Sequence, residues 1–108
     1  MARGKALDDN QLTDSMYYIL LSLIEPLHGY GIKQKILDLS NGEIEIGPAS
    51  LYTILKKLVT RNLIVLLEDD ENRKKTYQIS ESGRVLLKLD IERRIQMAEI
   101  GKNILNEL

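Results

Sequence analysis

The chain has 108 residues, of which 44% are hydrophobic and 29% are charged, with a formal net charge of -1 and no cysteine. This length suits one domain, and the composition is that of a chain able to bury a core. The lack of cysteine excludes a disulfide scaffold and a thiolate metal site, and it is consistent with a cytoplasmic protein. No apolar run approaches the ~18 residues of a membrane span, and the amino-terminal segment lacks the apolar region of a secretory signal.

Hydrophobic periodicity predicts helices over residues 11–24 and about 30–40. Asp8, Asp9 or Asn10 is expected to cap the first helix. Asn41-Gly42 is expected to end the second, because both residues tolerate left-handed backbone. Proline and glycine predict a turn over 25–29 between the two helices, and the alternating segment Glu43-Ile44-Glu45-Ile46 predicts a very short strand.

A third helix is predicted from Pro48 to about Arg61, followed by Asn62 as a left-handed residue. Two strands follow, 63–67 and 75–79, joined by a hairpin loop over 68–74. The run 63–67 is too continuously apolar to leave one face in water, whereas Tyr77 and Ile79 share one side of the second strand. Ser80 is the natural N-cap of a last helix that continues to the C-terminus.

This order of elements predicts a mainly α fold with a small β-hairpin wing, a winged helix-turn-helix. We expect residues 1–80 to form this domain, with 1–10 flexible. Residues 81–108 are expected to form a C-terminal dimerisation helix within the same compact unit.

The charge is unevenly distributed along the chain. Sixteen acidic residues are present, yet none lies between Glu45 and Glu68. That gap contains three bases, Lys56, Lys57 and Arg61. A second basic cluster, Arg73-Lys74-Lys75, follows the acidic run 68–71. The pI near 5.8 argues mildly against a nucleic-acid partner, but charges act over about 8–10 Å, so their distribution matters more than their sum.

The third helix has two different faces. Its apolar residues fall within one arc and are expected to join the core: Leu51, Ile54, Leu55, Leu58 and Val59. The opposite arc carries small or basic residues and no acid: Ala49, Ser50, Thr53, Lys56, Lys57 and Thr60, with Tyr52 at the boundary. An ordinary solvated face is the alternative interpretation. The absence of acids, the small residues of the first turn and the place in the helix order favour DNA.

Each of these side chains has a role to play on DNA. Lysines neutralise phosphates, and hydroxyls bind base edges or phosphates. We expect Ser50, Thr53, Lys56 and Lys57 to read the major groove, with Ala49 allowing close approach and Tyr52 reaching a phosphate or packing at the rim. Arg73, Lys74 and Lys75 form the expected wing contact, although the neighbouring acids leave a simple solvated loop as an alternative.

The last helix is apolar over roughly 240° of its circumference, which is wider than one core face requires. Fraying of its far end is one explanation. We favour a helix that packs one stripe on the helix at 11–24 and buries the rest against a second copy. The residues assigned to this interface are Leu87, Ile91, Ile95, Met97, Ala98, Ile100, Ile104 and Leu105.

Five segments of the chain form a recognisable set: Tyr18-Ile19-Leu20-Leu21-Ser22-Leu23, His28-Gly29-Tyr30-Gly31-Ile32, Ser50–Leu58, Leu63-Ile64 and Arg73–Gly83. In order and spacing these segments resemble the PadR family of bacterial transcriptional regulators. The resemblance implies a homodimer that binds operator DNA, commonly as a repressor. The short C-terminal region is similar to the branch with a single C-terminal helix, which includes small multidrug-sensing members.

The resemblance also implies a small-molecule effector site at the dimer interface, near the first and last helices. Some drug-binding members place a tryptophan midway along the last helix. This chain has no tryptophan, and Arg93-Arg94 stand at about that place, which argues against stacking of flat aromatic drugs.

Other function classes have less support in the sequence. A winged-helix module that binds protein rather than nucleic acid is the main alternative, favoured by the acidic pI and the acids at 68–71. No nucleophile, acid–base pair or metal-ligand spacing indicates an enzyme, a metal site or a cofactor. His28, the only histidine, has no evident partners for such chemistry and is expected to be a turn or packing residue.

Overall fold

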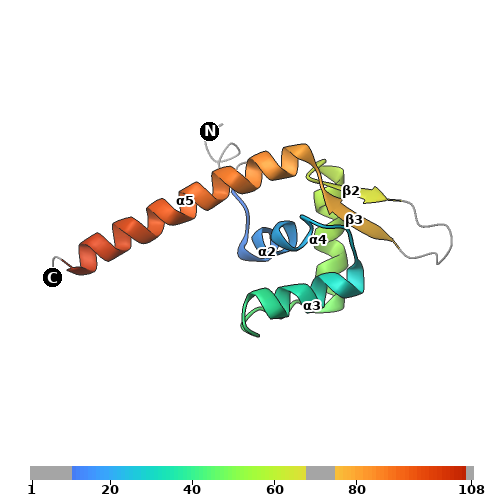
Figure 1. Ribbon diagram of the computed structural model, residues 1–108, viewed down its shortest axis with the longest axis horizontal. Helices are drawn as coiled ribbons and strands as arrows, with labels where there is room; N and C mark the ends of the chain where they lie inside the picture. Colours follow the sequence, from blue (N-terminus) through green and yellow to red (C-terminus); the bar gives the residue numbers. More distant parts are fainter. Residues whose placement is uncertain (1–10, 68–74, 107–108) are drawn as a thin grey trace.

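The computed structural model describes residues 11–67 and 75–106 (Figure 1). In chain order the elements are α2 (Asp14–Ser22), β1 (Leu27–His28), α3 (Gly29–Leu39), α4 (Pro48–Thr60), β2 (Ile64–Leu67), β3 (Thr76–Ile79) and α5 (Glu81–Asn106). The predicted class, mainly α with a small β wing, is confirmed. The predictions for 1–10, the hairpin loop 68–74 with Arg73 and Lys74, and residues 107–108 lie outside the described residues.

Helix α2 is shorter than predicted and begins after a different cap. The hydroxyl of Thr13 accepts the N–H of Met16 at 3.1 Å, so Thr13 is the N-cap of the helix rather than a residue at 8–10. Ile19 and Leu20 of α2 are fully buried at the centre of the core. The carbonyl of Leu23 then accepts the N–H of Ile79 at 2.8 Å, which joins the end of α2 to the sheet.

The sheet has three antiparallel strands in the order β1-β3-β2. Tyr77 and Ile79 of the central strand β3 are both buried, as the alternation predicted. In β2 only Ile64 is buried, while Val65, Leu66 and Leu67 are exposed, so the expectation that both faces of this run are covered is wrong for the single chain.

The short strand predicted at 43–46 is absent from the structure, and its place in the sheet is taken by β1. Asn41 and Gly42 do adopt positive φ, as predicted, and turn the chain away from α3. The N–H of Ile44 is then bound by the hydroxyl of Ser40 at 2.9 Å instead of by a neighbouring strand. Ile46 is buried, so the alternation marks one apolar side of an extended linker rather than a strand.

The helices of the motif end as the sequence predicts. Pro48 is the first residue of α4, and Asn62 adopts a φ of 61° after its last turn. The hydroxyl of Ser80 accepts the N–H of Gly83 at 3.0 Å and donates to the carbonyl of Asn62 at 2.6 Å. Ser80 therefore caps α5 and fastens its start to the end of α4.

Helix α5 crosses α2 and then extends beyond the rest of the chain (Figure 1). Residues 95–106 are all exposed, and we call this segment the distal half of α5. The radius of gyration is 15.7 Å, compared with about 13 Å for a compact domain of this size, and the projecting helix accounts for the difference. No helix within the described residues combines the length and apolarity needed to cross a bilayer.

Candidate nucleic-acid interface

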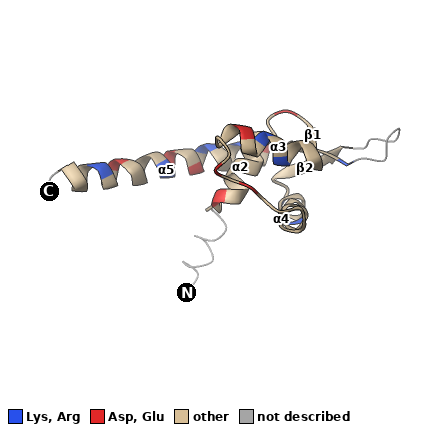
Figure 2. Ribbon diagram, turned by 90° about the horizontal axis from the view of Figure 1, so that it is seen from below, with Lys and Arg blue, Asp and Glu red and all other residues tan. Residues whose placement is uncertain are grey.

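Helix α4 presents the face that the sequence assigned to DNA. Leu51, Leu55 and Leu58 are buried, which turns the opposite side of the helix outward. All the assigned residues of α4 are exposed on that side: Ala49, Ser50, Tyr52, Thr53, Lys56 and Lys57. Red and blue alternate along α5 in Figure 2, whereas α4 carries no acid. The exposed face of α4 is therefore cationic.

Two hydroxyls on this face are fixed by the helix itself. Thr53 donates to the carbonyl of Ala49 at 2.9 Å, and Thr60 donates to the carbonyl of Lys56 at 2.9 Å. Because each hydroxyl proton points along the helix, the oxygen lone pairs remain available as acceptors. Thr53 can thus accept a hydrogen bond from an exocyclic amino group of a base, such as N6 of adenine or N4 of cytosine.

The C-terminal half of this face surrounds a shallow hollow of about 390 Å³. Its lining residues are Thr53, Lys56, Lys57, Thr60 and Arg61. Sequence reasoning placed Arg61 in the acid-free segment but did not assign it to the site. The available signal was its spacing, because Arg61 follows Lys57 by four residues and so continues the same face beyond the last turn.

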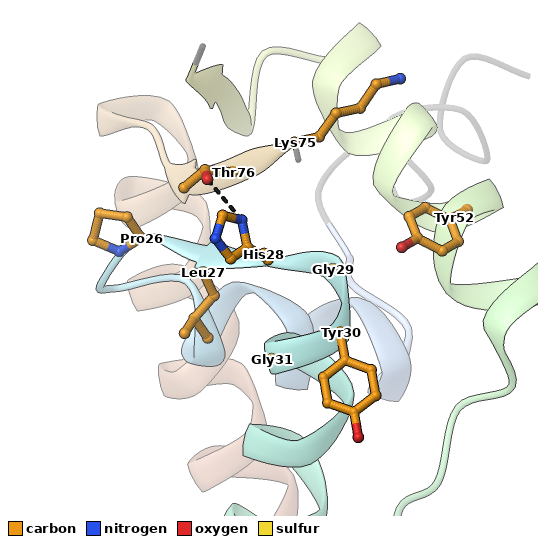
Figure 3. A pocket seen from close by; sticks show the side chains of 9 residues that line it. All are labelled: Pro26, Leu27, His28, Gly29, Tyr30, Gly31, Tyr52, Lys75 and Thr76. Atoms are coloured by element: carbon orange, nitrogen blue, oxygen red, sulfur yellow. Dashed lines mark hydrogen bonds between the residues drawn. The ribbon is translucent and has the colours of Figure 1, made fainter. Parts of the chain in front are cut away.

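A larger hollow, of about 770 Å³, lies where α3, α4 and β3 meet (Figure 3). Nine residues line it, namely Pro26, Leu27, His28, Gly29, Tyr30, Gly31, Tyr52, Lys75 and Thr76. Tyr52 reaches it from α4, and Lys75 from the base of the wing. This hollow joins two predicted DNA contacts, Tyr52 and Lys75, which are 23 positions apart in the sequence.

The contact between Tyr52 and Gly29 determines the shape of this hollow. A Cβ atom on residue 29 would lie 2.6 Å from the Tyr52 hydroxyl oxygen, so only glycine fits beneath the ring in its present position. Burial raises the pKa of the neighbouring Tyr77, and the proximity of Tyr52 raises it further. The phenol of Tyr77 therefore stays neutral, and it supplies no charge to the hollow.

The start of α3 adds backbone N–H donors to the same hollow. The first N–H groups of any helix have no partner within the helix. His28 precedes α3 but makes no side-chain cap, because its Nδ1 is 2.9 Å from the hydroxyl of Thr76 on β3. The backbone N–H groups and the Tyr52 hydroxyl are donors suited to a phosphate, and Lys75, whose side chain points outward in Figure 3, adds a positive charge at the edge of the hollow. Sequence reasoning missed this contribution of 28–31 and treated His28 as a turn residue.

The residues assigned to the dimer interface do not all face the same surroundings. Leu87 is 4% exposed and belongs to the core of its own chain, and Ile91 packs against that core. The remaining assigned residues lie on the distal half of α5 and are exposed: Ile95, Met97, Ala98, Ile100, Ile104 and Leu105. The assignment of Leu87 is therefore incorrect, because burial within the chain leaves its side chain almost no surface for a partner.

Among the residues that the structure describes, no three His, Cys, Asp or Glu side chains gather where they could hold a metal ion. The exposed face of α4 and the hollow beside it offer hydrogen-bond donors and positive charge, and the chemistry they suit is recognition of an anionic polymer.

Solved structures with the same fold include regulators from several bacteria. A PadR family transcriptional regulator from Eggerthella lenta has a TM-score of 0.68 at 22% identity, over 95% of this chain and 91% of that chain. A PadR family regulator from Clostridium difficile has a TM-score of 0.67 at 18% identity, over 83% and 97%. BpsR from Bordetella bronchiseptica, whose DNA binding is regulated by 6-hydroxynicotinic acid, has a TM-score of 0.67 at 18% identity, over 84% and 65%.

A comparison with curated proteins gives no significant match. The model of the transcriptional regulator PadR-like family, however, matches residues 19–89, which include α3, α4, both strands of the wing and the start of α5. With this match over more than half of its length, and with the winged fold in place, the chain belongs to the PadR-like family of transcriptional regulators.

Proposed function

We propose that this regulator binds a pseudo-palindromic operator as a homodimer in the cytoplasm, acts as a repressor and is not an enzyme. The observation that carries the proposal is the acid-free, cationic and exposed face of α4. Ser50 and Thr53 read bases from the first turns of α4, while Lys56 and Lys57 bind phosphates. Tyr52 and Lys75 bind the DNA backbone next to these contacts. Arg73 and Lys74 extend the contact with DNA as the wing.

Dimerisation is supported by the distal half of α5. Five of its apolar side chains are each at least 51% exposed: Ile95, Met97, Ile100, Ile104 and Leu105. Met97, Ile100 and Ile104 form a stripe along the helix, and Ile95 and Leu105 belong to a second one. Apolar side chains exposed in this way on a projecting helix are typical of a helix that buries against another chain. Two-fold symmetry would place two α4 helices about 34 Å apart, one turn of DNA, on two half-sites.

An effector response is a further part of the proposal. We infer a small-molecule site at the dimer interface near α2 and α5, whose ligand changes the separation of the two α4 helices. Its support is the likeness in fold to BpsR, the regulator controlled by 6-hydroxynicotinic acid. A coupling of about 1–3 kcal/mol between the two sites is enough for control. A panel of small aromatic acids added to the DNA complex tests this, with release of DNA as the expected result.

The DNA-binding proposal is tested by charge reversal on α4. Fragments bound by the parent are first selected from genomic DNA, and affinity for one selected duplex is then measured over a range of salt concentrations. The Lys56→Glu, Lys57→Glu variant should lose affinity, and its log–log salt slope should fall by about one for each phosphate contact removed. The matched control is Lys35→Glu, Lys88→Glu, which reverses the same charge at exposed positions on α3 and α5.

Equal affinity of the α4 variant and the parent would refute the role of this face. Equal losses in both variants would show that only total charge matters. If the selection recovers no fragment that the parent binds, a winged-helix module with a protein partner becomes the better description.

A further inference from the structure

Helix α5 changes its surroundings at Arg94. Before this residue it packs on the rest of the chain, with Gly83, Leu87 and Asp90 buried. After it, every described residue is exposed. The distal half of α5 extends about 18 Å from this point at 1.5 Å per residue. Contacts at Arg94 and just before it therefore determine the direction in which the distal half leaves the domain.

The carboxylate of Asp90 is the centre of these contacts, and its side chain is 0% exposed. Its Oδ1 accepts the Arg93 side chain at 2.9 and 3.1 Å and the backbone N–H of Leu12 at 3.4 Å. Its Oδ2 accepts Nε of Arg94 at 2.6 Å. Both oxygens of this buried acid are therefore satisfied, and one of their partners belongs to the segment that leads into α2.

Arg94 makes more contacts between α5 and α2 than Asp90 does. Its Nη1 donates to Asp14 at 2.9 Å, and its Nη2 donates to the carbonyl of Leu12 at 3.2 Å. Its guanidinium carbon lies 4.3 Å from the centre of the Tyr17 ring. The described contacts of Arg93, by contrast, stay on α5, because Arg93 donates to Asp90 and to the sulfur of Met97.

We propose that the ion pair of Asp90 and Arg94 on α5, through the contacts of Arg94 with Asp14 and Tyr17 of α2, forms an ionic lock between α2 and α5. This lock fixes the angle of the distal half and thereby the half-site spacing that the dimer reads. We call this pair the α2–α5 lock. The inference rests on the proposed function, because half-sites have meaning only for a dimer that binds DNA.

The chemistry of the lock favours a positioning role over a purely stabilising one. Burying the Asp90 carboxylate costs desolvation, so its ion pair adds little net stability compared with apolar residues of similar size. Its hydrogen bonds are directional, however, and the planar guanidinium presents donors in a fixed fork. An apolar contact would allow α5 to slide and tilt over α2, whereas this fork allows one orientation.

The position of the lock makes small angles matter. A tilt of about 10° at Arg94 moves the end of an 18 Å segment by about 3 Å. That shift is close to the 3.4 Å rise of one base pair. A loosened lock would therefore let each protomer move by about one base pair relative to its partner.

Two matched variants, Arg94→Lys and Arg93→Lys, test the lock. Both keep a positive charge beside Asp90 and both lose a guanidinium, but only the first removes contacts with α2. The chain has no cysteine, so Gln34→Cys, exposed on α3, gives a single spin-label site per protomer. Double electron–electron resonance then measures the distance between the two spin labels, one on each protomer of the dimer. The second readout is affinity for duplexes in which the selected half-sites are separated by spacers that differ by one base pair.

We expect a narrow distance distribution for the parent and for Arg93→Lys, and a broad or shifted one for Arg94→Lys. A spacer preference of about tenfold in the parent should fall below about threefold in Arg94→Lys and persist in Arg93→Lys. The proposal would be overturned if Arg94→Lys keeps the distance distribution and the spacer preference of the parent. It would also be overturned if the two variants change both readouts equally. If no distance between labels on two protomers is detected, the chain forms no dimer and the proposal is overturned as well.

Thermal melting of each variant separates loss of fold from loss of angle. If Arg94→Lys is unfolded, Tyr17→Leu replaces it, because this change removes the ring beneath the guanidinium and leaves the ion pair. A broadened distance distribution in Tyr17→Leu supports the lock, whereas a distribution equal to that of the parent contradicts it. If the parent binds no duplex but the distances respond as expected, the proposed function fails while the mechanical role of the lock stands.

Discussion

Gly29 has a role that its position at the start of α3 does not reveal. The Tyr52 hydroxyl occupies the space that a Cβ on residue 29 would need, at 2.6 Å. Tyr52 is 53% exposed, so its ring can swing outward if a methyl group is added. Gly29→Ala should therefore cost only about 1 kcal/mol of stability, at the low end for overpacking, and should displace the hydroxyl from the hollow shared with Lys75.

The measurable consequence of this displacement is weaker DNA binding without unfolding. Gly29→Ala and Tyr52→Phe should each reduce affinity for the selected duplex. The double variant should lose little more than either single one, because both act on the same hydroxyl. Additive losses in affinity would show that residue 29 acts on DNA independently of Tyr52.

Gly83 is restricted by backbone rather than by a side chain. A Cβ there would collide with the carbonyl oxygen of Leu63, which cannot move without displacing β2. Gly83→Ala should therefore lower the free energy of unfolding by about 3 kcal/mol, measured by denaturant titration. Ser82→Ala, at the exposed neighbouring position, should change it by less than about 0.5 kcal/mol. A tolerated Gly83→Ala would mean that α5 and β2 are not held this closely.

At the level of elements, local signals account for most of what the sequence predicted correctly. The two faces of α4, the cap at Ser80 and the left-handed residues Asn41 and Asn62 depend on neighbours within a few positions. They are readable because periodicity and capping act over one or two turns. The cationic face of α4 belongs to this class, and so the main part of the candidate site could be predicted.

The errors have a different origin, namely pairing between distant segments. Strand β1 has only two residues and exists because β3, almost 50 positions away, pairs with it. The contribution of 28–31 to the hollow depends on the same pairing. From the sequence, Asp90 is a polar residue on an amphipathic helix, and only contacts with a distant segment, such as the one with Leu12, 78 positions away, make it a buried carboxylate at the centre of a polar cluster.

The contact between α2 and α5 should depend on pH through Asp90. Burial alone would raise the pKa of this carboxyl, but hydrogen bonds from Arg94, Arg93 and the backbone of Leu12 outweigh it and hold the pKa below its ordinary value of 3.8. A carboxyl with a lowered pKa stabilises the fold above the ordinary value, and this contribution is lost as the pH falls through the folded-state pKa.

Asp90→Asn removes the charge at every pH, so it isolates this effect. At pH 7 the variant should be less stable than the parent by about 2 kcal/mol, because two partly exposed guanidiniums lose their partner. The difference should shrink below pH 4 as the parent's own carboxyl becomes protonated. Thermal melting from pH 7 to pH 3 measures it, with Asp14→Asn as control, since Asp14 is 78% exposed and should matter little at any pH. A constant difference across this range would assign the loss to packing rather than charge.

The whole molecule is elongated because one helix extends past its own domain, and its extents are 59 × 36 × 23 Å. A chain of this size that leaves a row of apolar side chains in water on such an extension has a surface suited to a second copy. The proposed dimer would also account for the placement of the cationic α4 face and the apolar stripe at different ends of a path through α4, the sheet and α5 (Figure 1).

Ile100→Glu, Ile104→Glu tests this arrangement by placing two carboxylates on the exposed stripe. Buried in an interface they would be costly, so the variant should be a folded monomer by light scattering at micromolar concentration. Its affinity for a duplex with two half-sites should fall at least about 100-fold, because bivalent binding is lost, while affinity for one half-site should be kept.

The control is Val85→Glu, Leu89→Glu, with the same spacing and charge at exposed positions on the first half of α5. If the control variant is a dimer and the Ile100→Glu, Ile104→Glu variant is a monomer, the interface lies on the distal half of α5. The reverse result would move it to the first half of α5, and monomers in the parent would remove the basis for reading two half-sites together.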